Sequence, residues 1–322
     1  MRALVNTRYG SPDVLQIKEV PKPVPTDNEV LVKIRATTVN RTDYGILTAK
    51  PFIARFFYGL TKPKITILGN EFAGVIDAVG DDVTSFAVGE KVFGYDDAAF
   101  GAHAQYKAVS EAALLATMPA NTSYEEAAPG NEGVHYALSI LRRADIQEGD
   151  RVVIYGATGA IGTAAVQLAK YYGAEITAVC DTENIELVKS LGADKVIDYT
   201  EDDFPNRDFT YEVVIDAVGK TSYSKWKPVL APRGLYLTTD LGPFLKIPLL
   251  VVWTRVVGSK RVLLPLPSHS KQDVVFFKEL IESGDFRPVI DRRYPFEQIV
   301  EAYRYVATGQ KIGNVVITVE HE

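Results

Sequence analysis

The sequence is poor in the residues that build disulfides and zinc sites. It contains one cysteine, Cys180, and four histidines, His103, His135, His269 and His321, in 322 residues. A single cysteine excludes a disulfide framework. A catalytic zinc takes thiolate and imidazole ligands, and here these residues are few and widely separated. The sequence therefore predicts no metal site.

Long hydrophobic runs and an excess of positive charge are also absent. The longest apolar run, Ile247 to Trp253, contains Pro248 and falls far short of the roughly 20 residues that a membrane-spanning helix needs. Residues 1–8 lack the apolar core of a signal peptide. A net charge of −6 disfavours nucleic acid as a partner. These absences predict a cytoplasmic protein with no nucleic-acid partner and no integral membrane span.

What remains is the composition of a globular protein, 47% apolar and 24% charged, with a length that suits two domains. Residues 1–121 are β-rich, with short strands separated by glycines. Residues 122–264 begin with a helical region from Tyr124 to about Arg143, and then strands and amphipathic helices alternate, which is typical of a parallel sheet covered on both faces. Residues 265–322 lose this alternation and end in a strand. If that strand returns to the first domain, residues 1–121 and 265–322 form one domain and 122–264 the other.

The strongest motif is the turn between a predicted strand and a predicted helix at residues 151–162. The apolar run 152–154 leads into Gly156, Gly159 and Gly162. The first glycine allows a tight turn, the second a close approach of the backbone to a pyrophosphate, and the third close packing of helix on strand. The free amide groups of the helix N-terminus then face the phosphates. This pattern predicts a dinucleotide-binding domain.

Other predicted strands end near the same edge of the sheet. Asp181 ends the second strand, about 20 residues after the glycines, where a carboxylate accepts hydrogen bonds from the ribose of NAD and repels a 2′-phosphate. Asp181, together with Glu183, favours NADH over NADPH. Ala217 and Val218 follow another strand and Thr238 ends a further one, so we expect them to line the cofactor.

A polar segment in the first domain, residues 39–44, follows an apolar strand. Asn40 has an amide suited to a ribose hydroxyl or a substrate carbonyl, and Tyr44 has a hydroxyl suited to proton donation. A capped turn without a catalytic role is the alternative. Downstream, Phe52, Ile53, Phe56, Phe57, Tyr58 and Leu60 form an apolar and aromatic patch. The patch is either buried core or the wall of an apolar substrate pocket.

Six stretches occur in a specific order and spacing. They are residues 39–43, 68–75, 88–94, 156–162, 191–199 and 311–316. On these residues the chain resembles the medium-chain dehydrogenase/reductase superfamily, specifically its zinc-free quinone oxidoreductase branch. The resemblance implies a GroES-like β domain and a Rossmann domain, with the active site in the cleft between them. It also implies that the cofactor contacts Thr158, Ala160, Ile161, Tyr199, Lys311 and Asn314.

Departures from the superfamily pattern sharpen this interpretation. Asn70 stands where zinc-dependent relatives carry a histidine, and their ligand cysteine near Asp43 is absent. Gly133 stands where many members have a threonine near the nicotinamide. Tyr199 matches a tyrosine found near the 2′-phosphate in NADPH-using members, which opposes the preference for NADH that Asp181 suggests.

These features predict a zinc-independent NAD(P)H-dependent oxidoreductase. A metal-free site suits substrates that delocalise the incoming negative charge, such as quinones and α,β-unsaturated carbonyl compounds. An enoyl-thioester reductase is an alternative of the same class. A dinucleotide-binding sensor or scaffold without catalysis is an alternative of another class, and Gly133 favours it.

Residues 244–264 place apolar side chains, among them Leu249, Val252 and Trp253, beside Arg255 and Lys260. This pattern is typical of a subunit interface, and the resemblance implies a homodimer. A surface that docks on a membrane is the alternative.

Overall fold

The computed structural model describes residues 1–50, 52, 55–201, 204–205, 209–242, 246–265, 267 and 270–321. The chain divides into two units, Met1–Glu132 with His269–Glu322, and Gly133–Ser268. The first boundary lies later than the expected one at residue 121. Residues 122–132 belong to the first unit because Ala127 and Ala128 pack in a buried cluster with Phe93 and Val316.

The first unit is organised around a seven-stranded sheet in the order β14-β15-β3-β4-β5-β7, with β6 also paired to β3. Its strands are β3 (Glu29–Val39), β4 (Glu71–Val79), β5 (Lys91–Tyr95), β6 (Tyr106–Ser110), β7 (Leu114–Thr117), β14 (Ile290–Pro295) and β15 (Asn314–Thr318). A separate two-stranded sheet joins β1 (Arg2–Val5) to β2 (Gln16–Glu19). As predicted, the C-terminal strand returns to the first unit, where Val316 of β15 pairs with Thr38 of β3 in antiparallel register.

Short helices complete the first unit. They are α1 (Arg41–Thr48), α2 (Arg55–Tyr58), α3 (Tyr124–Ala127), α9 (Lys271–Ser283) and α10 (Ile299–Ala307). The main core lies between the sheet and α10, where Phe296, Tyr303 and Val306 pack against residues of β3 and β4.

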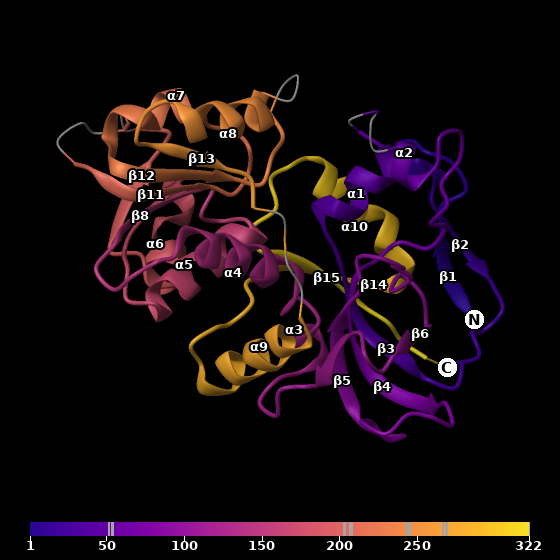
Figure 1. The fold of residues 1–322 in the computed structure, drawn as a ribbon. Helices are drawn as coiled ribbons and strands as arrows, with labels where there is room; N and C mark the ends of the chain where they lie inside the picture. Colours follow the sequence, from indigo (N-terminus) through magenta and orange to yellow (C-terminus); the bar gives the residue numbers. More distant parts are fainter. Residues whose placement is uncertain are drawn as a thin grey trace. The chain divides into compact units, whose positions relative to one another are not determined.

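The second unit contains a six-stranded sheet in which every pairing is parallel, in the order β10-β9-β8-β11-β12-β13. Its strands are β8 (Arg151–Tyr155), β9 (Glu175–Cys180), β10 (Lys195–Asp198), β11 (Tyr211–Asp216), β12 (Leu230–Thr238) and β13 (Arg261–Leu263). Its helices are α4 (Glu132–Ala144), which starts at the unit boundary, α5 (Ala160–Tyr171), α6 (Ile185–Ser190), α7 (Tyr223–Trp226) and α8 (Lys246–Val256). Helices α4, α5 and α6 cover one face of this sheet and α7 and α8 the other (Figure 1). The predicted doubly wound parallel sheet is confirmed.

Two local expectations differ from the structure. The helical region predicted from Tyr124 to Arg143 is interrupted at residues 128–131, because Pro129 lacks a backbone N–H and disfavours the helical conformation before it. The patch after residue 51 is not core: Phe52, Phe56 and Phe57 are 62%, 63% and 74% exposed, and Ile53 lies outside the described residues.

No helix in the described part of the chain combines the length and hydrophobicity that crossing a membrane requires.

Candidate functional site

The glycine turn of the second unit connects β8 to α5. Gly156 has a φ of +77°, and a Cβ added there would lie 2.7 Å from the Val218 side chain. A Cβ added at Gly162 would lie 2.1 Å from the carbonyl oxygen of Gly156, so the helix packs directly on the turn. At Gly159 the one atom of the described residues within 4 Å of an added Cβ is the Gly156 oxygen, at 3.8 Å. The turn is therefore tight on two sides and open at Gly159, as a bound pyrophosphate requires.

The parallel register brings the predicted residues of the second unit to one edge of the sheet. Tyr155 is level with Val179 and with Asp216, and Asp216 is level with Thr238. Strand β10 ends at Asp198, opposite Cys180. The glycine turn lies between β9 and β11, the two neighbours of β8, where the connections leave in opposite directions. Such a switch point is the usual ligand site of a doubly wound sheet.

Asp181 and Tyr199 lie together at this edge. The Asp181 carboxylate accepts a hydrogen bond of 2.5 Å from the Asn184 amide. Burial and the Asp181 carboxylate beside it raise the pKa of the Tyr199 hydroxyl. Asp181 remains partly exposed, so its carboxylate is accessible to a ribose.

The loop after β11 is shaped by the buried Asp216 carboxylate. It accepts hydrogen bonds from the amides of Val218 and Gly219, at 3.2 and 2.8 Å, and from the Tyr236 hydroxyl at 2.9 Å. A cavity of about 250 Å³ lies beside this loop, and Thr238 is among its lining residues. Asp216 thus positions the loop that contains Ala217 and Val218.

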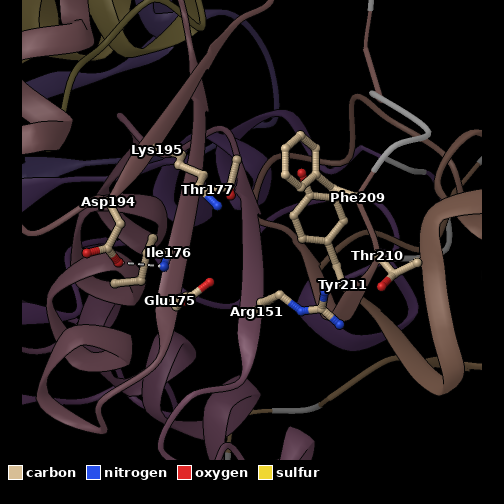
Figure 2. A pocket seen from close by; sticks show the side chains of 9 residues that line it. All are labelled: Arg151, Glu175, Ile176, Thr177, Asp194, Lys195, Phe209, Thr210 and Tyr211. Carbon is tan, nitrogen blue, oxygen red and sulfur yellow. Dashed lines mark hydrogen bonds between the residues drawn. The ribbon is translucent and has the colours of Figure 1, made fainter.

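A second hollow of about 140 Å³ lies at the opposite edge of the same sheet (Figure 2). Arg151, Glu175 and Lys195 line it, and each stands at the start of its strand. Arg151 pairs with Glu212 at 2.6 Å. Ligands of parallel sheets bind at the carboxyl ends of strands, so this hollow is not the expected cofactor site.

In the first unit, α1 begins at Asn40 beside a group of buried polar side chains. The Asp43 carboxylate accepts hydrogen bonds of 2.9 Å from the backbone N–H of Asn40 and of 2.9 Å from that of Gly69. Asp43 is fully buried, and burial raises its pKa to about 7. This carboxylate ties the start of α1 to the segment before β4.

Glu71 is the centre of the group. One oxygen accepts hydrogen bonds of 2.6 Å from the Thr38 hydroxyl and of 2.6 Å from the Asn40 amide. The other accepts from the backbone N–H groups of Asn131 and Glu132. Burial and the neighbouring Glu132 carboxyl raise the pKa of Glu71 to about 8, and the four donors oppose that shift because they favour the ionised form.

Both amide hydrogens of Asn40 are used in hydrogen bonds within this group. Its amide nitrogen donates to Glu71 and, at 3.0 Å, to the Thr38 hydroxyl. No amide hydrogen is left for a substrate oxygen, so the geometry opposes the expected donation from Asn40 to a substrate carbonyl. Its Oδ1 can still accept a hydrogen bond from a ribose hydroxyl. Tyr44, about one helical turn after Asn40, packs its ring against the main core of the unit.

Glu132 completes the group. Thr42 donates a hydrogen bond to its Oε1, whereas its Oε2 is buried and has no hydrogen-bond partner among the described residues. Burial, reinforced by the negative charge of Asp43, raises the pKa of Glu132 to about 7. Because Glu71 has four donors and Glu132 Oε2 has none, a proton shared by this pair resides on Glu132.

Lys311 lies near the buried carboxyls, whereas Asn314 lies at the start of β15. Burial lowers the pKa of the Lys311 amine to about 8, and the nearby carboxyls of Glu132 and Glu71 oppose that shift. Lys311 therefore belongs with the buried polar group. Asn314 is buried at the start of β15 and donates a hydrogen bond of 3.1 Å to the Val289 carbonyl.

Sequence reasoning assigned no role to Glu71, Glu132 or His103. The buried His103 ring bonds the Thr38 carbonyl at 2.7 Å and the Tyr303 hydroxyl at 3.1 Å, and burial lowers its pKa to about 4. Glu71 lies within residues 68–75, one of the six stretches that carry the resemblance. Its hydrogen-bond partners, Thr38 and Glu132, are far from it in sequence, so the pattern of these stretches did not reveal its role. Within the described residues, no cluster of three or more His, Cys, Asp or Glu side chains is suited to a metal ion.

Two sequence families match the chain. Residues 26–120 match the family described as alcohol dehydrogenase GroES-like domain, and residues 191–317 match the family described as zinc-binding dehydrogenase.

Curated and solved relatives cover nearly the whole chain. A 2-methylene-furan-3-one reductase from Solanum lycopersicum is 32% identical over 98% of this chain and 79% of its own length. An NADPH-dependent alkenal/one oxidoreductase from Arabidopsis thaliana, named as chloroplastic, is 30% identical with the same coverage of 98% and 79%. The structure of a quinone oxidoreductase from Coxiella burnetii has a TM-score of 0.86 at 25% identity and covers 99% of each chain.

Proposed function

Because the chain belongs to the medium-chain dehydrogenase/reductase superfamily, in its quinone oxidoreductase-like branch, we propose that it reduces quinones or α,β-unsaturated carbonyl compounds by hydride transfer from NAD(P)H. The observation that carries this proposal is the glycine turn, which is closed at Gly156 and Gly162 and open at Gly159. Relatives named for reductions of alkenals, methylene-furanones and quinones support it.

The reaction we propose is independent of zinc. The buried polar group around Glu71 offers amides, hydroxyls and carboxyls, and Asn70 contributes an amide rather than an imidazole. Amides and hydroxyls are poor ligands for zinc, and the carboxylates that do bind it in catalytic sites are combined with imidazole or thiolate ligands. A reduced nicotinamide, when bound, supplies the hydride. Quinones and conjugated carbonyl compounds spread the resulting charge over several atoms and so need less electrophilic help than a simple ketone.

The residues of each unit have separate roles in this proposal. Those of the second unit hold the dinucleotide, and they are Gly156, Thr158, Gly159, Ala160, Ile161, Asp181, Tyr199, Ala217, Val218 and Thr238. In the first unit, Asn40 accepts a hydrogen bond from a ribose hydroxyl and the Tyr44 hydroxyl donates one to the developing oxyanion. Lys311 and Asn314 remain proposed cofactor contacts.

A substrate panel tests this function. Oxidation of NADH and NADPH is followed with quinones, enals, enones, enoyl thioesters and primary alcohols, each with and without a chelator. We expect turnover of quinones or enones that the chelator leaves unchanged. Turnover confined to enoyl thioesters assigns the alternative reductase function. Cofactor binding without turnover of any acceptor assigns a sensor or scaffold, and chelator-sensitive alcohol oxidation contradicts a metal-free reaction.

We further propose that NADH is preferred to NADPH, because the Asp181 carboxylate repels a 2′-phosphate. Replacing it, Asp181→Ser, is expected to shift the ratio of the two dissociation constants toward NADPH by roughly tenfold or more, as removal of a like charge predicts. Titration calorimetry with both cofactors measures this ratio. Glu186→Ser, at an exposed position of α6, is the control and leaves the ratio unchanged. Wild-type protein that binds NADPH at least as tightly as NADH contradicts the preference.

We propose a homodimer formed through α8 and the edge strand β13. Leu249, Val252, Trp253 and Val256 are 62–83% exposed and share one face of α8. A second copy that covers this face removes a large apolar surface from water. Trp253→Asp is expected to convert a dimer into a monomer in sedimentation experiments, with Glu186→Asp as the control. A monomeric wild-type protein that binds anionic vesicles assigns the face to a membrane surface instead.

The cytoplasm remains our proposed compartment, since Cys180 is buried and forms no disulfide. Cell fractionation distinguishes it from the chloroplast, which the Arabidopsis relative is named for.

A further inference from the structure

The buried polar group of the first unit contains one acidic oxygen that the fold does not use. Glu132 is 6% exposed, and its Oε2 has no hydrogen-bond partner among the described residues. A buried polar atom without a partner destabilises the fold, because it has lost its hydrogen bonds to water and gained none in return. Oε1 of the same carboxyl already accepts the hydrogen bond from Thr42, so the Thr42 contact does not explain Oε2. Oε2 is therefore available for a role outside the fold, such as a contact with a ligand.

The Asn70 side chain beside Glu132 is also buried and without a hydrogen-bond partner among the described residues. The Asn70 amide lies near enough to the Glu132 carboxyl for a hydrogen-bonding interaction that lowers the pKa of Glu132, but the contact lacks the geometry of a complete hydrogen bond. Two neighbouring side chains thus present unsatisfied polar atoms at one place, as a site for a polar atom of a ligand does.

The charges around this place determine which ligand atom it takes. Glu132 faces Asp43 on α1, Glu71 on β4 and the amine of Lys311 before β15. Lys311 in turn faces Asp291 and Arg41. Three carboxyls against one nearby lysine leave a surplus of negative charge, so a free anion is disfavoured here. A neutral carboxylic acid that donates one hydrogen bond fits, and its natural acceptor is a carbonyl oxygen.

We propose that Glu132, in its protonated form, is the general acid of the reaction and donates the proton of Oε2 to the carbonyl or quinone oxygen of the substrate. This rests on the proposed function and extends it by one catalytic residue. The protonated carboxyl takes the place that a zinc ion has in metal-dependent sites. It polarises the substrate oxygen before hydride addition and protonates that oxygen afterwards.

The step balances for an enone. Hydride adds to the β carbon, the electron pair of the C=C bond moves toward the carbonyl, and the resulting enolate oxygen takes the proton from Glu132. The enol then gains a proton from water at its α carbon and loses its O–H proton, which gives the saturated ketone. The Glu132 carboxylate regains a proton from water, so one solvent proton is consumed for each hydride.

The surroundings keep this acid protonated near neutral pH. Burial and neighbouring carboxyls raise the pKa of both Glu132 and Glu71, to about 7 and about 8, so the pair holds a proton near neutral pH. The four donors on Glu71 stabilise a negative charge there, and the unpartnered Oε2 of Glu132 then carries the proton. An acid with a pKa near the working pH both holds its proton and releases it readily.

The variant Glu132→Gln tests this role, because glutamine keeps the size of the side chain and an oxygen for Thr42. We expect kcat with the best acceptor found in the substrate panel to fall by about 10²- to 10⁴-fold, the usual range for loss of a general acid. The dissociation constant for NAD(P)H and the melting temperature should change little. Glu186→Gln is the matched control and keeps full activity.

The pH profile separates a catalytic role from a structural one. The protonated form is the active one, so wild-type kcat should fall as pH rises through about 7, and this alkaline limb should be absent in Glu132→Gln. Lys311→Met removes a nearby positive charge, so it should raise the pKa of Glu132 and move the limb to higher pH. Loss of the limb in Lys311→Met instead assigns the acid to Lys311.

A spectroscopic measurement does not depend on turnover. At neutral pH the infrared spectrum of the wild-type protein should contain the carbonyl stretch of a protonated carboxyl group, shifted when a quinone analogue binds, and Glu132→Gln should lack that shift. A Glu132→Gln enzyme that folds and keeps both wild-type kcat and the alkaline limb overturns the inference. A wild-type protein that reduces no quinone, enone or enoyl thioester overturns the proposed function itself.

Discussion

Replacing Gly159 by valine is expected to weaken NAD(P)H binding by at least about 100-fold, which corresponds to roughly 2.7 kcal/mol, with little change in melting temperature. Gly159 has an extended backbone that any residue adopts, with a φ of −74°. The nearest atom to an added Cβ is 3.8 Å away, so the protein itself accommodates a side chain. The valine methyl groups instead fill the space through which the backbone approaches the pyrophosphate. Calorimetric titration with NADH and thermal unfolding measure the two effects.

Gly162→Ala is the contrasting variant. Its new Cβ would lie 2.1 Å from the Gly156 oxygen, so the turn must open, and we expect a lower melting temperature together with weaker binding. If Gly159→Val binds cofactor as tightly as the wild-type protein, the dinucleotide does not lie on this turn.

Glu71→Leu is expected to lower the free energy of unfolding by about 3–5 kcal/mol, the range found when one partner of a buried charged network is removed. Leucine fills much of the volume but accepts no hydrogen bond. The Thr38 hydroxyl, the Asn40 amide and two backbone N–H groups would then be buried without an acceptor. Urea unfolding monitored by circular dichroism gives the free energy.

Two further variants test whether the loss of stability comes from the buried hydrogen bonds of Glu71. Glu71→Gln keeps one acceptor oxygen and should lose clearly less stability than Glu71→Leu. Glu301→Leu replaces an exposed glutamate of α10 that pairs with Arg304 on the surface, and it should change stability by no more than about 0.5 kcal/mol. Equal losses for Glu71→Leu and Glu301→Leu would mean that the buried network contributes no special stability.

The parts of this protein that follow from local pattern could be predicted from sequence. A strand, three spaced glycines and a helix lie within residues 151–162, and each glycine has a steric reason that is local to the turn. The parallel sheet follows from repeated alternation of apolar strands and amphipathic helices. Its register then places Asp181, Val218 and Thr238 at one edge without further information.

The buried polar group could not be predicted in the same way. Glu71 contacts Thr38 and Glu132, and Tyr303 contacts His103 across 200 positions of sequence. No periodicity marks such pairs, because each residue alone looks like an ordinary polar side chain in a β-rich segment. The sequence could not show where the Asn40 amide hydrogens go for this reason, since they are taken by partners that only the fold brings close.

The patch after residue 51 shows a different limit. Its aromatic residues satisfy every compositional criterion for core, yet Phe52, Phe56 and Phe57 are exposed. Apolar composition alone does not say whether a segment is covered, since roughly half of any protein surface is apolar.

The pairing of β15 with β3 has a consequence for the order in which the chain folds during synthesis. Strand β3 lies between β15 and β4, and β15 ends only at Thr318. The first unit therefore cannot complete its sheet until β15, at Asn314–Thr318, has left the ribosome. The second unit, Gly133–Ser268, is contiguous, and domains fold as their sequence emerges. The second unit is thus complete before the first, while residues 36–39 of β3 wait for β15; residues 29–33 of β3 already pair with β6.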